Sequence, residues 1–262
     1  MTQPDTRPAL EALRAQISRL EGRSGRERAV LPFGVGEIDR RLPGGGLALG
    51  ALHEVAGGGA DALHCAAAGQ FAAGIAARAT GKVLWIVTRA DLFAPALQQA
   101  GLSSARVIFV EAGTDRDGLA CFEEGLRHGG PGTVVADVAR LTMPASRRLQ
   151  LAAETSGALG IAIRRWRRQA DAADFGQPTA AVTRWRVSVL PSGPLPVPGV
   201  GRGRWRLELM RARAGESAAF EVEACDERGR LALPGAADRL AVPAALGDRP
   251  GAAASGRGRA SA

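Results

Sequence analysis

The stretch Gly57-Gly58-Gly59-Ala60-Asp61-Ala62-Leu63-His64 stands between a predicted strand, residues 51–55, and a predicted helix, residues 62–79. A phosphate loop at such a junction holds nucleotide phosphates with backbone N–H groups, a lysine and a Ser/Thr hydroxyl. Here Leu63 and His64 take the positions of the lysine and the hydroxyl. Because each lost charged hydrogen bond costs about 1.5–3 kcal/mol, we expect Gly57, Gly58 and Gly59 to form a structural turn and the protein to use no cofactor.

Apolar strands and helices alternate after this turn. The predicted strands span residues 82–87, 107–110, 133–137 and 159–163, and the predicted helices span 94–100, 116–128 and 146–156. Continuous apolar strands between helices are typical of a parallel sheet covered on both faces. Arginine and apolar residues then alternate at 185–190, 205–210 and 219–223, which predicts antiparallel strands with one face in solvent. We therefore predict an α/β fold with a mostly parallel twisted sheet, flanking helices and an antiparallel C-terminal extension.

Segments of different composition flank this domain, which we place at residues 30–242. Residues 1–29 combine an amphipathic helix with a polar linker, and residues 243–262 have the composition of a disordered tail. The apolar stripe of the helix either packs on the protein's own core or binds a partner. Its residues are Leu10, Leu13, Ile17 and Leu20.

The charge of the chain is divided unevenly. Residues 1–138 carry a net charge of −1 and residues 139–262 a net charge of +9. The basic half favours a polyanion or an acidic protein as partner, or forms a solvated face. With no apolar run of roughly 18 residues and no signal peptide at the polar N-terminus, we expect a cytoplasmic protein without a membrane partner.

The order of elements resembles the core of RecA-type recombinases over roughly residues 30–235. Residues 31–55 resemble the start of that core, and the resemblance assigns to Asp137 the position of the magnesium-organising aspartate. From the residues alone, Asp137 could equally cap the segment that follows it. The position of the family's catalytic glutamate falls close to Arg89. With lysine, hydroxyl and glutamate all replaced, we predict that the protein is not an enzyme.

Short phrases stand at residues 31–34, 42–47, 53–55, 156–158, 183–185 and 204–209. They resemble those of a narrower family, ImuA, the RecA-like accessory proteins of bacterial mutagenesis cassettes. This resemblance implies a role in damage-induced translesion DNA synthesis, in the nucleoid region of the cytoplasm. The partners it implies are RecA, an ImuB-like polymerase homologue and an error-prone DNA polymerase subunit. A SulA-like division inhibitor that binds the division-ring protein, or a divergent RecA-like ATPase, are the alternatives.

Two groups of basic residues are candidate contacts for single-stranded DNA or a partner. The first is Arg164-Arg165-Trp166-Arg167-Arg168, at the position where a loop of RecA-type proteins contacts DNA; an arginine and tryptophan there could instead pack on each other. The second flanks Trp185 and Trp205, and if both tryptophans face inward its arginines face outward together. The second group is Arg184, Arg186, Arg202, Arg204 and Arg206.

Overall fold

The computed structural model describes residues 29–59, 61–166, 175–193, 201–213 and 215–235. The predicted N-terminal helix with Leu10, Leu13, Ile17 and Leu20, the tail at 243–262, and Arg167 and Arg168 lie outside these residues.

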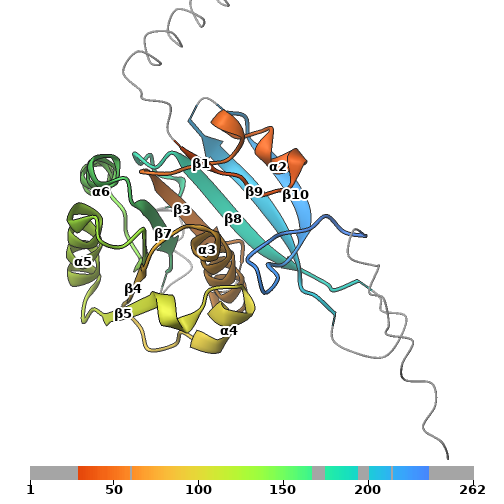
Figure 1. The fold of residues 1–262 in the computed structure, drawn as a ribbon, viewed down its shortest axis with the longest axis horizontal. Coiled ribbons are helices and arrows are strands. Elements are labelled where there is room, and N and C mark those ends of the chain that lie inside the picture. Colours follow the sequence, from red (N-terminus) through yellow and green to blue (C-terminus); the bar gives the residue numbers. More distant parts are fainter. Residues whose placement is uncertain (1–28, 60, 167–174, 194–200, 214, 236–262) are drawn as a thin grey trace, which may run out of the picture.

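One sheet of eight strands organises the protein, in the order β10-β9-β8-β3-β7-β6-β4-β5 (Figure 1). Six strands are parallel to one another, and the last two are antiparallel to their neighbours. This confirms the predicted α/β class, its mostly parallel sheet and its antiparallel C-terminal part. The strands are β3 (Leu52–Gly57), β4 (Val83–Val87), β5 (Val107–Glu111), β6 (Thr133–Val138), β7 (Leu159–Arg164), β8 (Thr183–Leu190), β9 (Arg204–Ala212) and β10 (Ala218–Glu223).

The direction of β8 differs from the prediction. β8 pairs in parallel with β3, with Glu54 opposite Arg184, and the antiparallel pairs are β8 with β9 and β9 with β10. A parallel neighbour requires a long connection, and residues 165–182 provide one. The antiparallel extension therefore begins one strand later than the arginine pattern suggested.

Helices cover both faces of the sheet (Figure 1). α3 (Ala66–Arg78) and α4 (Ala94–Gln99) lie on one face, and α5 (Asp115–His128) and α6 (Met143–Ser156) lie on the other. Smaller elements complete the fold. These are β1 (Val30–Leu31), α2 (Gly36–Asp39), β2 (Leu47–Ala48), the 3-10 turns Pro43–Gly45 and Ser104–Arg106, and the π-helical turn Asp61–Cys65. In the described part of the chain, no helix is both long and apolar enough to cross a membrane.

Local sequence signals set the helix boundaries. Thr142 caps α6 by accepting the N–H of Ala145, Pro144 stands in the first turn, and Gly157 ends the helix at φ 79°. These residues are typical of helix ends. They start α6 at Met143, three residues before the predicted residue 146, because the Thr142 cap and Pro144 set this end, and apolar periodicity does not detect a cap.

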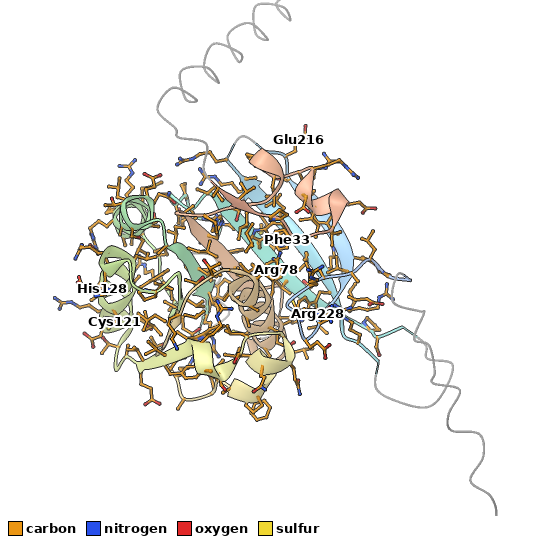
Figure 2. All side chains as sticks on the ribbon, viewed as in Figure 1. Phe33, Arg78, Cys121, His128, Glu216 and Arg228 are labelled. Carbon is orange, nitrogen blue, oxygen red and sulfur yellow. The ribbon has the colours of Figure 1, made fainter. Side chains whose placement is uncertain are left out.

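Aromatic side chains fill the core beneath α3. Phe33, Phe71 and Trp185 contact one another, with ring centroids 5.5 to 5.8 Å apart, and Trp205 contacts Phe71 at 6.4 Å. The Arg78 guanidinium lies over the Phe33 ring, 5.1 Å from its centroid (Figure 2). Trp185 and Trp205 are buried, which confirms that both tryptophans face inward.

Candidate functional site

The glycine-rich turn packs tightly against the histidine that follows it. A Cβ at Gly57 would lie 2.8 Å from the backbone of His64, and one at Gly59 would lie 2.7 Å from the His64 ring. His64 Nδ1 accepts the N–H of Val189 in β8 at 3.1 Å. The side chain of Leu63, at the lysine position, is 57% exposed. The glycines therefore allow His64 to close the turn against β8.

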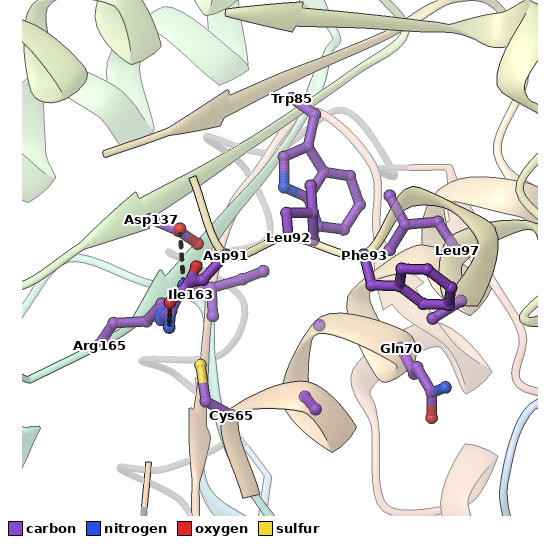
Figure 3. Close-up of a pocket in the computed structure, with 13 residues that line it drawn as sticks. Cys65, Gln70, Trp85, Asp91, Leu92, Phe93, Leu97, Asp137, Ile163 and Arg165 are labelled. Carbon is purple, nitrogen blue, oxygen red and sulfur yellow. Dashed lines mark hydrogen bonds and ion pairs between the residues drawn. The ribbon is translucent and has the colours of Figure 1, made fainter. Parts of the chain in front are cut away.

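An arginine occupies the acidic site at the ends of the parallel strands (Figure 3). Arg165, directly after β7, donates through Nη1 to Asp137 Oδ2 at 3.2 Å. Its Nη1 and Nη2 also donate to the two carboxylate oxygens of Asp91 at 2.7 Å each. Asp137 stands in β6 and Asp91 follows β4. One guanidinium thus links β7, β6 and the chain after β4 by charge-assisted hydrogen bonds, which are bidentate to Asp91 and single to Asp137.

The two carboxyl groups respond differently to this environment. Burial raises the pKa of Asp137 from 3.8 to about 6, although the neighbouring Arg165 opposes the shift. Hydrogen bonds from Arg165 lower the pKa of the more exposed Asp91. Burial therefore disfavours the charged form of Asp137, and the positive charge beside it comes from Arg165.

A pocket of about 570 Å³ adjoins the acidic site, between α3 and the chain that leads into α4 (Figure 3). Its walls are largely apolar, with Trp85 and Leu97 on one side and Ile163 on the other. Trp85 Nε1 is buried without a hydrogen-bond partner in the described structure. Among the described residues, no three His, Cys, Asp or Glu side chains gather as a metal site would require.

Two of the predicted contact arginines lie inside the protein, which corrects the expectation that they meet DNA or a partner. Arg164 Nη1 donates to Glu54 Oε2 at 2.8 Å, and Arg184 Nη2 donates to Glu54 Oε1 at 3.0 Å. The side chains of Glu54 and Arg164 are fully buried, and that of Arg184 is 8% exposed. The alternating pattern correctly predicted that Arg184 and Trp185 point to different faces of the sheet, but the face on which Arg184 lies is covered by other parts of the chain.

The cover consists of the chain that returns to β8. The Thr179 hydroxyl donates to Glu54, and Arg184 also donates to the carbonyl of Gln177 at 2.8 Å. Phe175 lies under the Arg184 guanidinium at 5.1 Å and meets the edge of Trp166 at 5.7 Å. The aromatic side chain that we expected to offer a face to DNA bases is thus packed against Phe175.

The other predicted arginines lie nearer the surface. Arg186, Arg202 and Arg204 are half-buried and form ion pairs with glutamates of β9 and β10, at N···O distances of 3.7, 3.4 and 3.1 Å. Arg206 is exposed. These positions leave their role as DNA or partner contacts a prediction.

Sequence reasoning missed Glu54 and Asp91. The sequence could have revealed Glu54, because a carboxylate within an apolar, buried strand such as β3 needs a charged or hydrogen-bonding partner. The sequence could not have revealed Asp91, since only the fold brings it to Arg165.

Comparison with known proteins now defines the class and then the family. The structure is similar to the crystal structure of the RadB recombinase, with a TM-score of 0.54 and 17% identity over 78% of this chain and 99% of that one. The chain therefore has a RecA-like fold. It is 39% identical to Protein ImuA of Caulobacter vibrioides, in two strains, over 205 residues that cover 74% of this chain and 83% of that protein. No family model matches the chain. The chain belongs to the ImuA family.

Proposed function

We propose that the protein is a non-catalytic RecA-like adaptor in damage-induced translesion DNA synthesis. It links RecA or single-stranded DNA to an ImuB-like polymerase homologue and an error-prone DNA polymerase subunit. Membership of the ImuA family supports the pathway, and the RecA-like fold supports a part played beside RecA. The partner contacts come from the predicted helix stripe and from the surface arginines Arg186, Arg202, Arg204 and Arg206.

The observation that carries the non-catalytic role is the position of Arg165. Its guanidinium holds both Asp91 and Asp137 at the strand ends, where ATPases of this fold place magnesium and the γ-phosphate. A nucleotide with its metal would have to displace a bidentate ion pair, with no lysine to hold the phosphates. The same carboxylates serve the adaptor by fixing the shape of this end of the sheet.

The first test asks whether ATP is used. The purified protein should show no ATP turnover, and Leu63→Ala should restore damage-induced mutagenesis to a deletion strain as fully as the wild-type gene, because Leu63 is exposed and contributes no phosphate ligand. ATP turnover that Asp137→Ala abolishes would overturn the non-catalytic role. Far-UV circular dichroism of each variant confirms that it is folded.

The second test addresses the adaptor role. Deletion of the gene should reduce damage-induced mutation frequency, and the tagged protein should co-purify from damaged cells with RecA and the ImuB-like protein. Replacement of Leu13 and Ile17 by Glu should weaken one of these associations. A deletion strain with normal damage-induced mutagenesis would refute the pathway assignment, whatever the protein binds.

A further inference from the structure

A second hollow lies on the opposite face of the sheet from α3. It is a groove of about 440 Å³ between α6, residues 179–180 and the end of β9. Leu151 of α6 lines it with 62% of its side chain exposed, which makes Leu151 one of five large exposed apolar residues in the described structure. The charged and apolar side chains around it are Met143, Arg147, Leu151, Glu154, Arg211 and Arg213.

The groove is positively charged, with three arginines against one glutamate and a net charge of +2. Arg211 is oriented by donating from Nη1 to the carbonyl of Thr179 at 2.8 Å. Neither Arg147 nor Arg213 forms an ion pair with another described residue. In contrast, the adjacent Arg148 pairs with Glu123 at 3.0 Å. Charge on this part of α6 is therefore available for a partner.

The combination of charge with an exposed leucine identifies the kind of partner. Proteins that bind single-stranded nucleic acid combine a basic groove with aromatic side chains on which bases stack, and none of the described residues lining this groove is aromatic. Leu151 and Met143 instead offer an apolar contact between basic groups. This arrangement matches a peptide segment, in which an apolar anchor is surrounded by complementary charge.

We propose that this groove binds an acidic segment of a protein partner. An apolar side chain of the segment lies on Leu151, and its carboxylates pair with Arg147, Arg211 and Arg213. The proposal deepens the adaptor role and rests on it for the presence of a protein partner. It places the contact on α6 and the end of β9, outside both groups of arginines that the sequence pointed to.

The test places a photo-crosslinking amino acid at position 151 of the full chain in damaged cells. The matched control carries it at position 63, another exposed leucine. We expect position 151 to crosslink to a protein, and mass spectrometry should map the attachment to a segment rich in Asp and Glu. Crosslinking to DNA, crosslinking to a segment without acidic residues, or a yield at position 151 no higher than at position 63 would each overturn the proposal.

Charge reversal provides an independent readout. Arg147→Glu combined with Arg213→Glu should weaken binding of the mapped segment by about tenfold or more, equivalent to 1.4 kcal/mol per factor of ten. Arg116→Glu, an exposed arginine of α5, serves as control and should leave binding unchanged. Unchanged binding by the folded double variant would refute the groove alone, whereas normal damage-induced mutagenesis in a deletion strain would refute the adaptor role.

Discussion

Glu54 pairs with two guanidinium groups inside the protein, those of Arg164 and Arg184, so replacing it by Gln is a direct test of how the core is held. The substitution keeps the size of the side chain and removes its charge. Arg164 and Arg184 then remain inside the protein, and one of the two carboxylate oxygens that they now contact at 2.8 and 3.0 Å is replaced by an amide NH2 group, which cannot accept a hydrogen bond. The carbonyl groups that also accept from Arg164 and Arg184 are neutral and compensate only in part.

The size of the effect follows from burial. Removing one partner of a buried ion pair costs about 3–5 kcal/mol, because the other charge stays desolvated. Here the side chains of Glu54 and Arg164 are fully buried, and a second guanidinium depends on the same carboxylate. We expect Glu54→Gln to lower the free energy of unfolding by about 4 kcal/mol, a large part of the 5–15 kcal/mol that is usual for a folded protein.

Urea unfolding followed by far-UV circular dichroism measures this loss. Glu216→Gln is the matched control, because it removes an ion pair with Arg41 at 2.7 Å whose side chains are 80% and 49% exposed. Such a pair contributes little, so the control should unfold within about 0.5 kcal/mol of wild type. A loss below about 1 kcal/mol for Glu54→Gln would refute the reasoning.

A compensating variant separates lost charge from lost packing. Glu54→Leu combined with Arg164→Met and Arg184→Met removes all three charges and keeps similar volumes. Apolar replacement of a whole buried ion network is often neutral or stabilising. We expect the triple variant to be more stable than Glu54→Gln. A triple variant less stable than the single one would mean that the hydrogen bonds to the returning chain matter more than the charge balance.

Three further changes test the site and the fold. Because the pKa of Asp137 is raised to about 6, this residue favours the folded state at low pH, and that advantage is lost as the pH rises through about 6. Measured by urea unfolding, the stability of Asp137→Asn relative to wild type should therefore increase by up to about 3 kcal/mol between pH 4 and pH 8. A stability difference that stays constant between the two pH values would contradict the raised pKa. Arg165→Ala breaks the contacts with Asp91 and Asp137 and should raise hydrogen exchange in the segment after β4, with a stability loss on the order of 2 kcal/mol; unchanged exchange would show that the ion pair does not hold this segment. A Cβ at Gly46 would lie 2.8 Å from the backbone of β1, so Gly46→Ala should lower the midpoint of thermal unfolding. In contrast, a Cβ at Gly69 in α3 meets nothing within 4 Å, so Gly69→Ala should raise the midpoint. Equal midpoints for the two variants would be evidence against close packing at β1.

The fold was largely predictable because hydrophobic periodicity reports which residues share a face. It placed five parallel strands, the helices between them and the inward position of Trp185 and Trp205. It did not give the direction of β8, because a strand alternates in the same way in a parallel and an antiparallel pair. It also did not predict the burial of Arg184, because an alternating pattern does not show which face of the sheet other segments of the chain will cover.

The candidate site was predictable only in part. Asp137 was placed by resemblance, and the basic character of Arg165 was plain in the sequence. Their association with Asp91 depends on strands β4, β6 and β7 being neighbours in the sheet. Strand order is set by tertiary packing, so no local pattern reveals which carboxylate a given arginine will meet.

The net charge of +9 in residues 139–262 therefore overstates the basic surface of that half. Arg164 and Arg184 neutralise a carboxylate within the core, and Arg165 neutralises two at the strand ends. These arginines come from the two groups that were predicted to contact DNA or a partner, and they act on the protein's own acidic groups. In the proposed adaptor, the charge that reaches a partner belongs instead to exposed residues such as Arg147, Arg206 and Arg213. Substitutions at the two locations should consequently have different effects. Those in the interior should change the free energy of unfolding, and those on α6 and β9 should change partner binding in a protein that remains folded.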